Sequence, residues 1–521
     1  MAFLLLIAFT AAIAALSSYL WTWTYWRRRG IRGPSEPPIL GSALVMHNAQ
    51  YPPYLQLRDW TKQYGSVYGI TEGVARMLVI SDPTLVQEVM VNQFDNFFGR
   101  KVNPIQGDPD KDKLVHLVTA QGQRWKRLRT ISSPTFSNNS LRKLKNTVEE
   151  SVVELMRHIE EQTAGGRAID LLTFYQEYTL DVIGRIAMGQ TDTQMFKNPM
   201  LPYVKAVFGE RGKGMFIAAM VSPTVGWLIR QMLINLPNFV QNPAVHIIKT
   251  MEKAVKQRIA QRETDAENGI EPGEPQDFID LFLDARCDQD YLGETNDDFS
   301  KTSIGKVTRQ LTTDEIVGQC FVFLVAGFDT TALSLSYTSF LLATHPGVQT
   351  KLREEIDREC VEPEITFDQL ARLKYLDQVI KETLRLYPLG ALANSRRCMR
   401  DTRIGDVVVE KGVEVLCDTW TLHYDKKVWG EDADEFRPER WEECGEEHLE
   451  HKGAYIPFGL GPRQCIGMRL ALMEEKLLLA HLLRKFIMQT GPETQIPLKL
   501  VGMRTTAPES VRLHLKLRDD I

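Results

Sequence analysis

The sequence lacks the cysteine arrangement of a disulfide-stabilised protein. Its 521 residues contain seven cysteines, scattered at positions 287, 320, 360, 398, 417, 444 and 465 without any Cys-x-x-Cys pair. An odd, unclustered set argues against a disulfide framework and favours a reducing compartment. The formal net charge is −5, and no basic stripe or arm is present, which argues against a nucleic-acid partner.

Repeats, low-complexity tracts and electron-carrying motifs are also missing. No Gly-x-Gly-x-x-Gly fingerprint follows a predicted strand, and the cysteine spacing does not suit an iron–sulfur cluster. The chain is therefore not expected to collect electrons by itself. Composition changes abruptly only at the N-terminus, and the remaining length is enough for one large core around a buried cofactor.

The N-terminus begins with an uncharged apolar run, Ala2–Leu20, followed by aromatic residues between positions 21 and 26 and by arginines at 27–29. The run is long enough to cross a hydrocarbon core of about 30 Å as a helix. A cleaved signal peptide would carry its basic residues before the run, so an uncleaved anchor fits better. We expect a transmembrane anchor at 1–26, a basic and proline-rich linker at 27–41, and a cytosolic globular domain at 42–521.

Helical periodicity dominates the globular domain, which is expected to be mostly α with a small β portion. The apolar segment Arg211–Met251 is broken by three prolines and suits either core packing or short helices on a bilayer surface. Helices are predicted at Leu141–Gln162, Ile169–Gly189, Ile247–Arg262, Thr313–Thr344, Gln349–Cys360 and Leu376–Leu386. Hairpins are predicted for Val67–Ile70 with Arg76–Ser81, Arg403–Val409 with Val413–Cys417, and Leu498–Val501 with Val511–Leu517.

One cysteine, Cys465, lies in a glycine-rich loop directly before a predicted helix at about 466–486. It would sit at the positive end of the helix dipole, which lowers a thiol pKa and favours metal ligation. The amides that follow can donate hydrogen bonds to the sulfur. Arg463 could donate to a ring carboxylate, Phe458 could shield the sulfur, and the glycines leave room for a large planar group. Most lone cysteines at a helix start are small buried hydrophobes, but these neighbours together predict a metal ligand.

The predicted helix Thr313–Thr344 contains an unusual polar pair, Asp329-Thr330, after the small residues Ala326 and Gly327. A glycine costs about 1 kcal/mol inside a helix, and a buried carboxylate costs more unless it is partnered, so the pair suggests a function. Gly327 could open the helix and leave a kink for water or oxygen, with Asp329 and Thr330 relaying protons. The structural alternative places Asp329 in an ion pair and bonds Thr330 back to the helix.

Both patterns resemble signatures of the cytochrome P-450 family. Phe458-x-x-Gly461-x-Arg463-x-Cys465-x-Gly467 matches the haem-ligand loop at every fixed position, and Ala326-Gly327-x-Asp329-Thr330 resembles the oxygen-activating helix. The resemblance covers essentially the whole chain and points to the microsomal class, in particular the vertebrate drug- and steroid-oxidising type. It implies a cytochrome P-450 fold and haem b with Cys465 as axial thiolate, which favours O–O cleavage.

The resemblance also implies roles for residues that a bare pattern would place on the surface. Glu382, Arg385 and Arg440 would form a buried network that holds the cysteine loop. Thr330 would stabilise bound oxygen, Asp329 would assist proton delivery, and Ala326 would line the haem face. The haem carboxylates would be bound by Trp125, Arg129, Arg396, Arg463 and, as a weaker candidate, Arg100; Arg397 competes with Arg396 because the spacing after Pro388 is a residue longer than usual.

The function implied is that of a haem-thiolate monooxygenase inserting one atom of O2 into an apolar lipid, steroid or xenobiotic. Electrons would come from NADPH through cytochrome P-450 reductase, with cytochrome b5 as a second donor, at the endoplasmic reticulum membrane. Lys126, Arg127 and Arg469 would offer the donor a basic face. The segment 211–251 would form a lid over the substrate channel.

Two alternatives stay open from the sequence. One is a haem-thiolate isomerase or dehydratase that acts on a peroxide and needs neither O2 nor a reductase; the intact Asp329-Thr330 pair argues against it. The other is a membrane-tethered haem sensor or carrier without enzymatic activity, which the complete Glu382, Arg385 and Cys465 motifs do not exclude. Turnover with NADPH and reductase distinguishes the monooxygenase from both.

Overall fold

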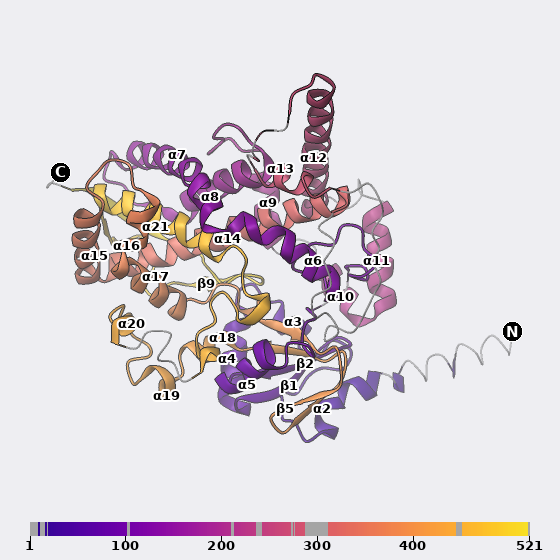
Figure 1. The fold of residues 1–521 in the computed structure, drawn as a ribbon. Coiled ribbons are helices and arrows are strands. Elements are labelled where there is room, and N and C mark those ends of the chain that lie inside the picture. Colours follow the sequence, from indigo (N-terminus) through magenta and orange to yellow (C-terminus); the bar gives the residue numbers. More distant parts are fainter. Residues whose placement is uncertain are drawn as a thin grey trace.

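A large helical part and a smaller part built around β-strands make up the structure (Figure 1). The computed structural model describes residues 9–10, 16–17, 19–101, 105–209, 213–235, 242–271, 273, 275, 277–286, 311–443 and 451–518. Most of these residues are helical and the strands are short, which confirms the expected mostly α chain with a small β portion.

The long helices follow the predicted periodicity closely. The helix predicted at Thr313–Thr344 has those same bounds, and the one predicted at Leu376–Leu386 begins two residues earlier. The α-helices are α2 Tyr25–Arg28, α3 Ala43–Met46, α4 Pro53–Tyr64, α5 Pro83–Gln87, α6 Gly122–Ser132, α7 Asn138–Thr163, α8 Leu171–Met188, α9 Leu201–Phe208, α10 Lys213–Val221, α11 Pro223–Asn235, α12 Pro243–Glu267, α13 Phe278–Leu283, α14 Thr313–Thr344, α15 Pro346–Glu359, α16 Phe367–Arg372, α17 Lys374–Leu386, α18 Thr419–His423, α19 Lys426–Trp429, α20 Arg440–Glu443 and α21 Met468–Lys485. The shorter 3-10 or π turns are η1 Glu88–Asn92, η2 Ser133–Phe136, η4 Ala391–Ala393, η6 Lys452–Ala454 and η7 Gly461–Arg463.

Four small sheets accompany the helices in the described part of the chain. The largest has the order β1-β2-β7-β4, with β1 Val67–Glu72, β2 Ala75–Ile80, β7 Glu414–Cys417 and β4 Ser395–Arg397. The others are β3-β11-β8 (β3 Ile169–Asp170, β11 Arg512–Leu517, β8 Phe486–Gln489), β5-β6 (Thr402–Ile404, Val407–Val409) and β10-β9 (Ala507–Pro508, Leu500–Val501). The predicted hairpin of β1 and β2 is confirmed, with Val67 opposite Ile80.

The other two predicted hairpins are wrong. β7 runs parallel to β2 and antiparallel to β4, while β5 and β6 pair with each other. Near the C-terminus β9 pairs with β10, and β11 pairs with β8 and β3. Gly405, with a φ of +51°, allows a turn between β5 and β6, which the prediction treated as one strand, and Gly502, with a φ of +110°, allows the turn that follows β9 toward β10, a strand that the prediction missed.

Helix α14 runs through the middle of the helical part and packs against α8, α12, α17 and α21 (Figure 1). Thr312 and Glu315 form a capping box that fixes where it begins. In the part of the chain that the structure describes, only α14 is long and apolar enough to cross a bilayer. Most of it is buried within the fold, as in a core helix.

The N-terminal segment joins the globular part before the expected boundary at residue 26. Most of the apolar run Ala2–Leu20 lies outside the described residues. Tyr25 and Trp26, which the expected anchor includes, are buried, and the Trp26 indole donates to the Ile70 carbonyl at 2.9 Å. The structure therefore packs the last residues of the expected anchor into the globular core.

The expected linker at 27–41 is likewise held against β1. Glu36 accepts hydrogen bonds from the Ser42 hydroxyl at 2.5 Å and from the Thr71 amide at 2.7 Å. The Gly69 amide donates to the Arg32 carbonyl at 2.9 Å. At Gly33 a Cβ would stand 2.1 Å from the Gly69 oxygen, so only glycine fits that contact. The segment is a packed strap rather than a free tether.

The segment Arg211–Met251 combines the two arrangements expected of it. Residues 211, 212 and 236–241 lie outside the described part, and the rest forms α10, α11 and the start of α12. Helix α10 buries Ile217 and Met220, whereas Trp227 and Leu228 of α11 are 57% and 54% exposed. One helix thus packs on the core while the next offers apolar side chains to the outside.

Two adjacent carboxyl groups of α21, Glu474 and Glu475, are buried against the helical core. Glu475 accepts hydrogen bonds from the hydroxyls of Ser334 and Thr338 on α14 at 2.9 and 3.0 Å. Burial nevertheless raises the pKa of Glu475 to about 7. The folded chain therefore favours the protonated form of this side chain.

We expect Glu475→Gln to stabilise the protein at pH 8 and to have a much smaller effect at pH 5. A carboxyl whose pKa rises from 4.5 to about 7 on folding stabilises the fold less as pH rises through that window, because the buried group must then ionise. When the group is fully ionised, the free energy of unfolding has fallen by roughly 3 kcal/mol through this side chain. Thermal unfolding at the two pH values measures it, with exposed Glu431→Gln as control; equal shifts at both pH values would contradict the assignment.

Candidate functional site

The cysteine loop closes on itself just before α21. The Cys465 amide donates to the Phe458 carbonyl at 2.8 Å, and Phe458 packs against the core. Gly461 has a φ of +72°, and a Cβ there would stand 2.2 Å from the Met90 oxygen. The glycine predicted to leave room for a planar group thus makes a close contact with the backbone of η1.

The thiol of Cys465 is accessible although the protein surrounds it closely enough to desolvate it, so it faces an internal space. The amides of Gly467 and Met468 donate to the sulfur, which confirms the expected contribution from the start of α21. The sequence analysis expected a lowered thiol pKa. Burial outweighs these amides and the nearby charges of Arg129 and Arg100, so the pKa of the Cys465 thiol is raised instead. A metal ion at the sulfur would supply the missing stabilisation of the thiolate.

Helix α14 has one accessible stripe in its otherwise buried middle section. The stripe consists of Phe321, Val325, Ala326, Gly327 and Thr330, whereas residues 322–324, 328–329 and 331–343 are buried. Ala326 and Thr330, four residues apart, lie on one side of the helix, with Val325 to one side of them and Gly327, which packs on α8, to the other. That face therefore borders an internal space, and Ala326 is the exposed residue at its centre.

Asp329 and Thr330 lie at the end of this stripe. Thr330 donates its hydroxyl to the Ala326 carbonyl at 2.8 Å. Buried Asp329 accepts hydrogen bonds from the Gln176 amide at 3.1 Å and the Thr505 hydroxyl at 2.7 Å, and forms no ion pair among the described residues. Burial raises the pKa of Asp329, so this carboxyl holds a proton more readily than a solvated one.

The helix continues without interruption through Gly327, where an opening was expected. A Cβ at this position would stand 3.1 Å from Cδ1 of Ile183 on α8. The small residue therefore permits close packing of α14 on α8, which is a structural reason for a glycine in a core helix.

Four arginines gather beside the cysteine loop without an acidic partner in the described part of the chain: Arg100, Arg129, Arg396 and Arg463. Burial lowers the pKa of Arg100 to about 10, and the charge of Arg129 adds to the effect. Burial and the charge of Arg100 lower the pKa of both Arg396 and Arg463. The Nε atoms of Arg100 and Arg396 are buried without a hydrogen-bond partner. Such a cluster is costly unless an anion enters it.

Backbone carbonyls fix these guanidinium groups at the rim of the site. Arg129 donates to the Gln464 carbonyl at 2.8 Å, and Arg396 donates to the Leu460 carbonyl at 3.2 Å, so both hold the cysteine loop. Arg100 donates to the Ala393 carbonyl.

Arg463 is the most strongly tied of the four. It donates to the carbonyls of residues 98, 117, 118 and 120 at 2.7–3.5 Å. Its guanidinium also lies 4.5 Å from the ring centre of Trp125, which is buried. These contacts anchor the cysteine loop to the segment that precedes α6.

The neighbours Arg396 and Arg397 lie on opposite faces of β4, because side chains alternate along a strand. Arg396 is 1% exposed and close enough to Arg100 for the two charges to interact. Arg397 lines a separate cavity of about 730 Å³ together with Glu72 and Arg230. Only Arg396 belongs to the cluster beside the cysteine loop.

The internal space fits haem b. It offers an accessible thiol, an apolar helix face, and a rim of uncompensated guanidinium groups that two ring carboxylates would neutralise. The partnerless buried Nε atoms of Arg100 and Arg396 mark where an anionic group is missing. Elsewhere, no group of three or more His, Cys, Asp or Glu among the described residues could hold a metal ion.

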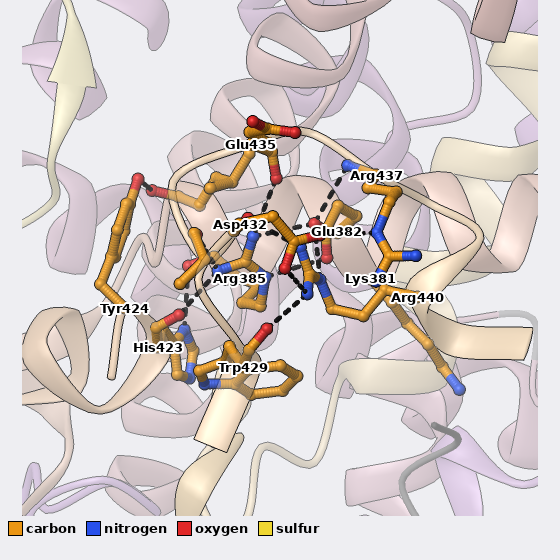
Figure 2. A network of polar contacts seen from close by, with 12 residues as sticks. Lys381, Glu382, Arg385, His423, Tyr424, Trp429, Asp432, Glu435, Arg437 and Arg440 are labelled. Atoms are coloured by element: carbon orange, nitrogen blue, oxygen red, sulfur yellow. Dashed lines mark hydrogen bonds and ion pairs between the residues drawn. The ribbon is translucent and has the colours of Figure 1, made fainter. Parts of the chain in front are cut away.

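A second group of buried charges forms a network centred on Glu382 (Figure 2). Glu382 accepts two hydrogen bonds from Arg385, at 2.8 and 2.9 Å, and one from Arg440 at 3.3 Å. The Trp441 indole and the Arg437 amide complete its shell at 3.0 and 3.2 Å. The structure therefore brings together the three residues that the sequence comparison grouped.

A histidine that the sequence analysis missed joins this network to the cysteine loop. His423 Nδ1 lies 3.2 Å from the Arg385 carbonyl, and its Nε2 accepts from the Ile456 amide at 3.0 Å. Burial, and then the charge of Arg385, lower the pKa of His423 to about 3, so it stays neutral with its proton on Nδ1. Ile456 in turn accepts from the Gly459 amide, within the loop. The sequence around His423 contains no local pattern that predicts these contacts.

Arg127, which was expected to belong to a basic surface for the electron donor, does not lie on the surface. Arg127 is buried and donates to Glu315 of α14 at 2.6 and 3.0 Å, so it cannot meet a partner protein. This correction arises because Glu315 lies far away in the sequence. Lys126 is half-buried and Arg469 is exposed.

Comparison with known proteins agrees with this site. The cytochrome P-450 family model matches residues 31–515. Two Caenorhabditis elegans proteins described as cytochromes P-450, CYP13A10 and CYP13A4, are 60% and 58% identical to the chain over 99% of its length and 100% and 99% of theirs. The mostly helical fold with small sheets is that of the family. The chain thus belongs to the cytochrome P-450 family, a family of monooxygenases.

Proposed function

We propose that this chain is a microsomal haem-thiolate monooxygenase that inserts one atom of O2 into an apolar substrate. The observation that carries the proposal is the accessible thiol of Cys465 in an internal space bordered by the accessible stripe of α14. Haem, when bound, supplies oxygen activation, which side chains alone do not provide. Cys465 would be the metal ligand, and Arg100, Arg129, Arg396, Arg463 and Trp125 would bind the haem carboxylates.

Two residues of α14 would hold a proton and accept a hydrogen bond in this space. Asp329 holds a proton more readily than a solvated carboxyl, and its Oδ2 accepts from the Thr505 hydroxyl. The Thr330 hydroxyl donates to the Ala326 carbonyl, which leaves its oxygen free to accept a hydrogen bond from the internal space. Thr330 would orient bound oxygen, and Asp329 would supply protons to it.

The endoplasmic reticulum membrane is the proposed location, with the catalytic domain in the cytosol. Support comes from apolar side chains on one region of the surface: Trp227 and Leu228 of α11 and Leu44 of α3 are exposed. The Tyr19 hydroxyl donates to the Val221 carbonyl, which places the N-terminal helix beside α10. A membrane-spanning helix that ends before the buried residues Tyr25 and Trp26 would bring these helices, the proposed lid, to the bilayer.

The proposed electron donor is NADPH–cytochrome P-450 reductase, with cytochrome b5 as a second candidate. Exposed Arg469, just after the cysteine loop, offers a positive charge to such a donor. Expression with reductase tests the proposal directly. We expect a red-displaced Soret band for the reduced carbon monoxide complex and NADPH-dependent oxygenation of an apolar compound. Turnover of a lipid hydroperoxide without NADPH would favour the isomerase, and a haem protein without turnover would favour the sensor.

Thr330→Ala is expected to retain haem but to lower the yield of product per NADPH by roughly tenfold or more, with hydrogen peroxide released instead. The reason is that the hydroxyl facing the internal space is lost while the buried helix stays intact. Product, peroxide and NADPH are measured in one assay. Thr330→Ser keeps the hydroxyl and serves as control; unchanged coupling in Thr330→Ala would remove this side chain from the mechanism.

A further inference from the structure

The cavity of about 730 Å³ that Arg397 lines is a second site, separate from the space beside Cys465. Its walls come from the β1–β2 turn, the sheet strands β4 and β7, the loop before α6, and the facing parts of α10 and α11. None of the described residues that line it belongs to the α14 stripe or to the cysteine loop. A ligand of this cavity is therefore not a ligand of the haem face.

Charged side chains of both signs line the cavity, with an excess of cations. Six are basic and four are acidic, although the chain as a whole carries a formal charge of −5. Three of the acids pair with three of the cations: Glu72 with Lys101 at 2.6 Å, Asp112 with Arg230 at 3.1 Å, and Asp108 with Lys111 at 3.8 Å. Arg76 pairs at 3.1 Å with Glu410, which does not line the cavity. The remaining cations are Arg397 and Lys411.

Arg397 and Lys411 lie together on one wall. The Gly412 amide donates to the Cys398 carbonyl at 2.7 Å, and a Cβ at Gly412 would stand 3.9 Å from Nη2 of Arg397. Neither basic side chain forms a hydrogen bond or an ion pair with another residue that the structure describes. Buried Glu414 lies opposite Arg397 in the sheet and offsets part of the charge. The wall therefore keeps a positive excess.

Another wall of the cavity is apolar and reaches the surface. Ala219 and Met220 of α10 are buried in it, and Trp227 of α11 is 57% exposed. The Val74 amide donates to the Met220 carbonyl at 3.1 Å, and a Cβ at Gly73 would stand 2.0 Å from the same oxygen. The β1–β2 turn therefore fixes the end of α10, and with it the apolar wall, against the sheet that carries the charged wall.

The two walls together fit an anion with an apolar body. A guanidinium fork and a lysine ammonium are donors that bind phosphate groups in proteins. Trp227 and Leu228, both more than half exposed, belong to the helix proposed to meet the bilayer, so a phospholipid is the amphipathic anion at hand. Basic pockets beside a membrane surface recognise lipid headgroups by this chemistry.

We propose that the cavity binds an anionic phospholipid, with its phosphate group between Arg397 and Lys411 and its acyl chains along Met220 and Trp227. The inference rests on the proposed membrane location and not on the monooxygenase reaction. The lipid is a ligand and not a substrate. Its binding holds α10 and α11 against the bilayer.

Native mass spectrometry of the full-length protein, released from detergent, tests the proposal with two lipids that share their acyl chains. We expect dioleoyl phosphatidic acid to bind roughly tenfold more tightly than dioleoyl phosphatidylcholine, because the unpaired arginine and lysine repel the choline cation. In Arg397→Gln/Lys411→Gln the affinity for phosphatidic acid should fall to that for phosphatidylcholine. Lys411→Gln alone, at an exposed turn, should lose part of the difference. Trp227→Ala should weaken both lipids alike.

The matched control is Arg403→Gln/Lys427→Gln, which removes one exposed arginine and one exposed lysine that do not line the cavity. It should distinguish the two lipids as the unmodified protein does. Glycerol 3-phosphate separates a lipid headgroup from a free phosphate ester, and should displace phosphatidic acid only at an excess of about 100-fold or more, because it lacks the acyl chains.

Three results would overturn the proposal: equal affinities for the two lipids, a loss in the control as large as in the cavity variant, or displacement by equimolar glycerol 3-phosphate. Absence of the red-displaced carbon monoxide band from the unmodified protein would instead contradict the proposed function, and would leave the lipid measurements as they stand.

Discussion

Replacement of Glu382 by alanine is expected to give aggregated protein without haem. Glu382 is fully buried and accepts five hydrogen bonds, two from Arg385 and one each from Arg440, Trp441 and the Arg437 amide. Alanine leaves the buried guanidinium of Arg385 without a carboxylate and leaves Arg440 with Asp432 as its remaining carboxylate partner, and breaking such a network costs roughly 3–5 kcal/mol or more. That is a large fraction of the stability of a domain. Haem content per polypeptide and the soluble fraction are the measurements.

Two variants separate this effect from general damage. Glu382→Gln retains the shape and loses only the charge, and we expect it to keep part of the haem content. Glu431→Ala removes an exposed glutamate that pairs with Lys426, and should behave like the unmodified protein because exposed pairs contribute little. Normal haem content in Glu382→Ala would contradict the structural role of the network.

Cys465→Ser is expected to abolish both the red-displaced carbon monoxide band and oxygenation, while the protein still folds. Serine differs from cysteine by one atom and can accept the same hydrogen bonds from the Gly467 and Met468 amides, so we expect the exchange to cost little stability. Serine, however, cannot provide a thiolate that pushes electron density onto a bound iron. The absorption spectrum of the reduced carbon monoxide complex and the rate of substrate oxygenation are the readouts.

The control for this variant is another cysteine. Cys398 is buried, and its thiol donates to the Arg400 carbonyl at 2.8 Å, a bond that a serine hydroxyl can also make. Cys398→Ser should therefore retain the band and the activity. Retention of the band in Cys465→Ser would show that another residue binds the iron.

Most of the long helices could be predicted from local sequence patterns. Helix α14 could be predicted because its boundary has a strong local signal, the Thr312–Glu315 capping box, and α17 because its apolar residues recur on one face. Strand β7 could not be paired correctly, since all four of its residues are buried and show no alternation. Its partners, β2 and β4, are set by the tertiary fold.

The site was predictable where its chemistry is concentrated in a short motif and was hidden where it depends on distant partners. The loop around Cys465 and the pair Asp329-Thr330 carry their chemistry within a few residues. Arg127 was misassigned because its partner Glu315 belongs to another helix. His423 escaped notice because one of its neighbours, Ile456, lies on the cysteine loop and only folding brings them together.

The packed strap after the N-terminal helix has a mechanical consequence. The Trp23 indole donates to the Glu36 carbonyl at 2.9 Å, and Trp26, Gly33 and Glu36 are each fastened to β1. These contacts would keep the proposed membrane helix and the catalytic domain from rotating independently of each other. The tilt of the helix in the bilayer would then determine the tilt of the catalytic domain. The strap would also fix the distance between the exposed side chains of α11 and the membrane surface.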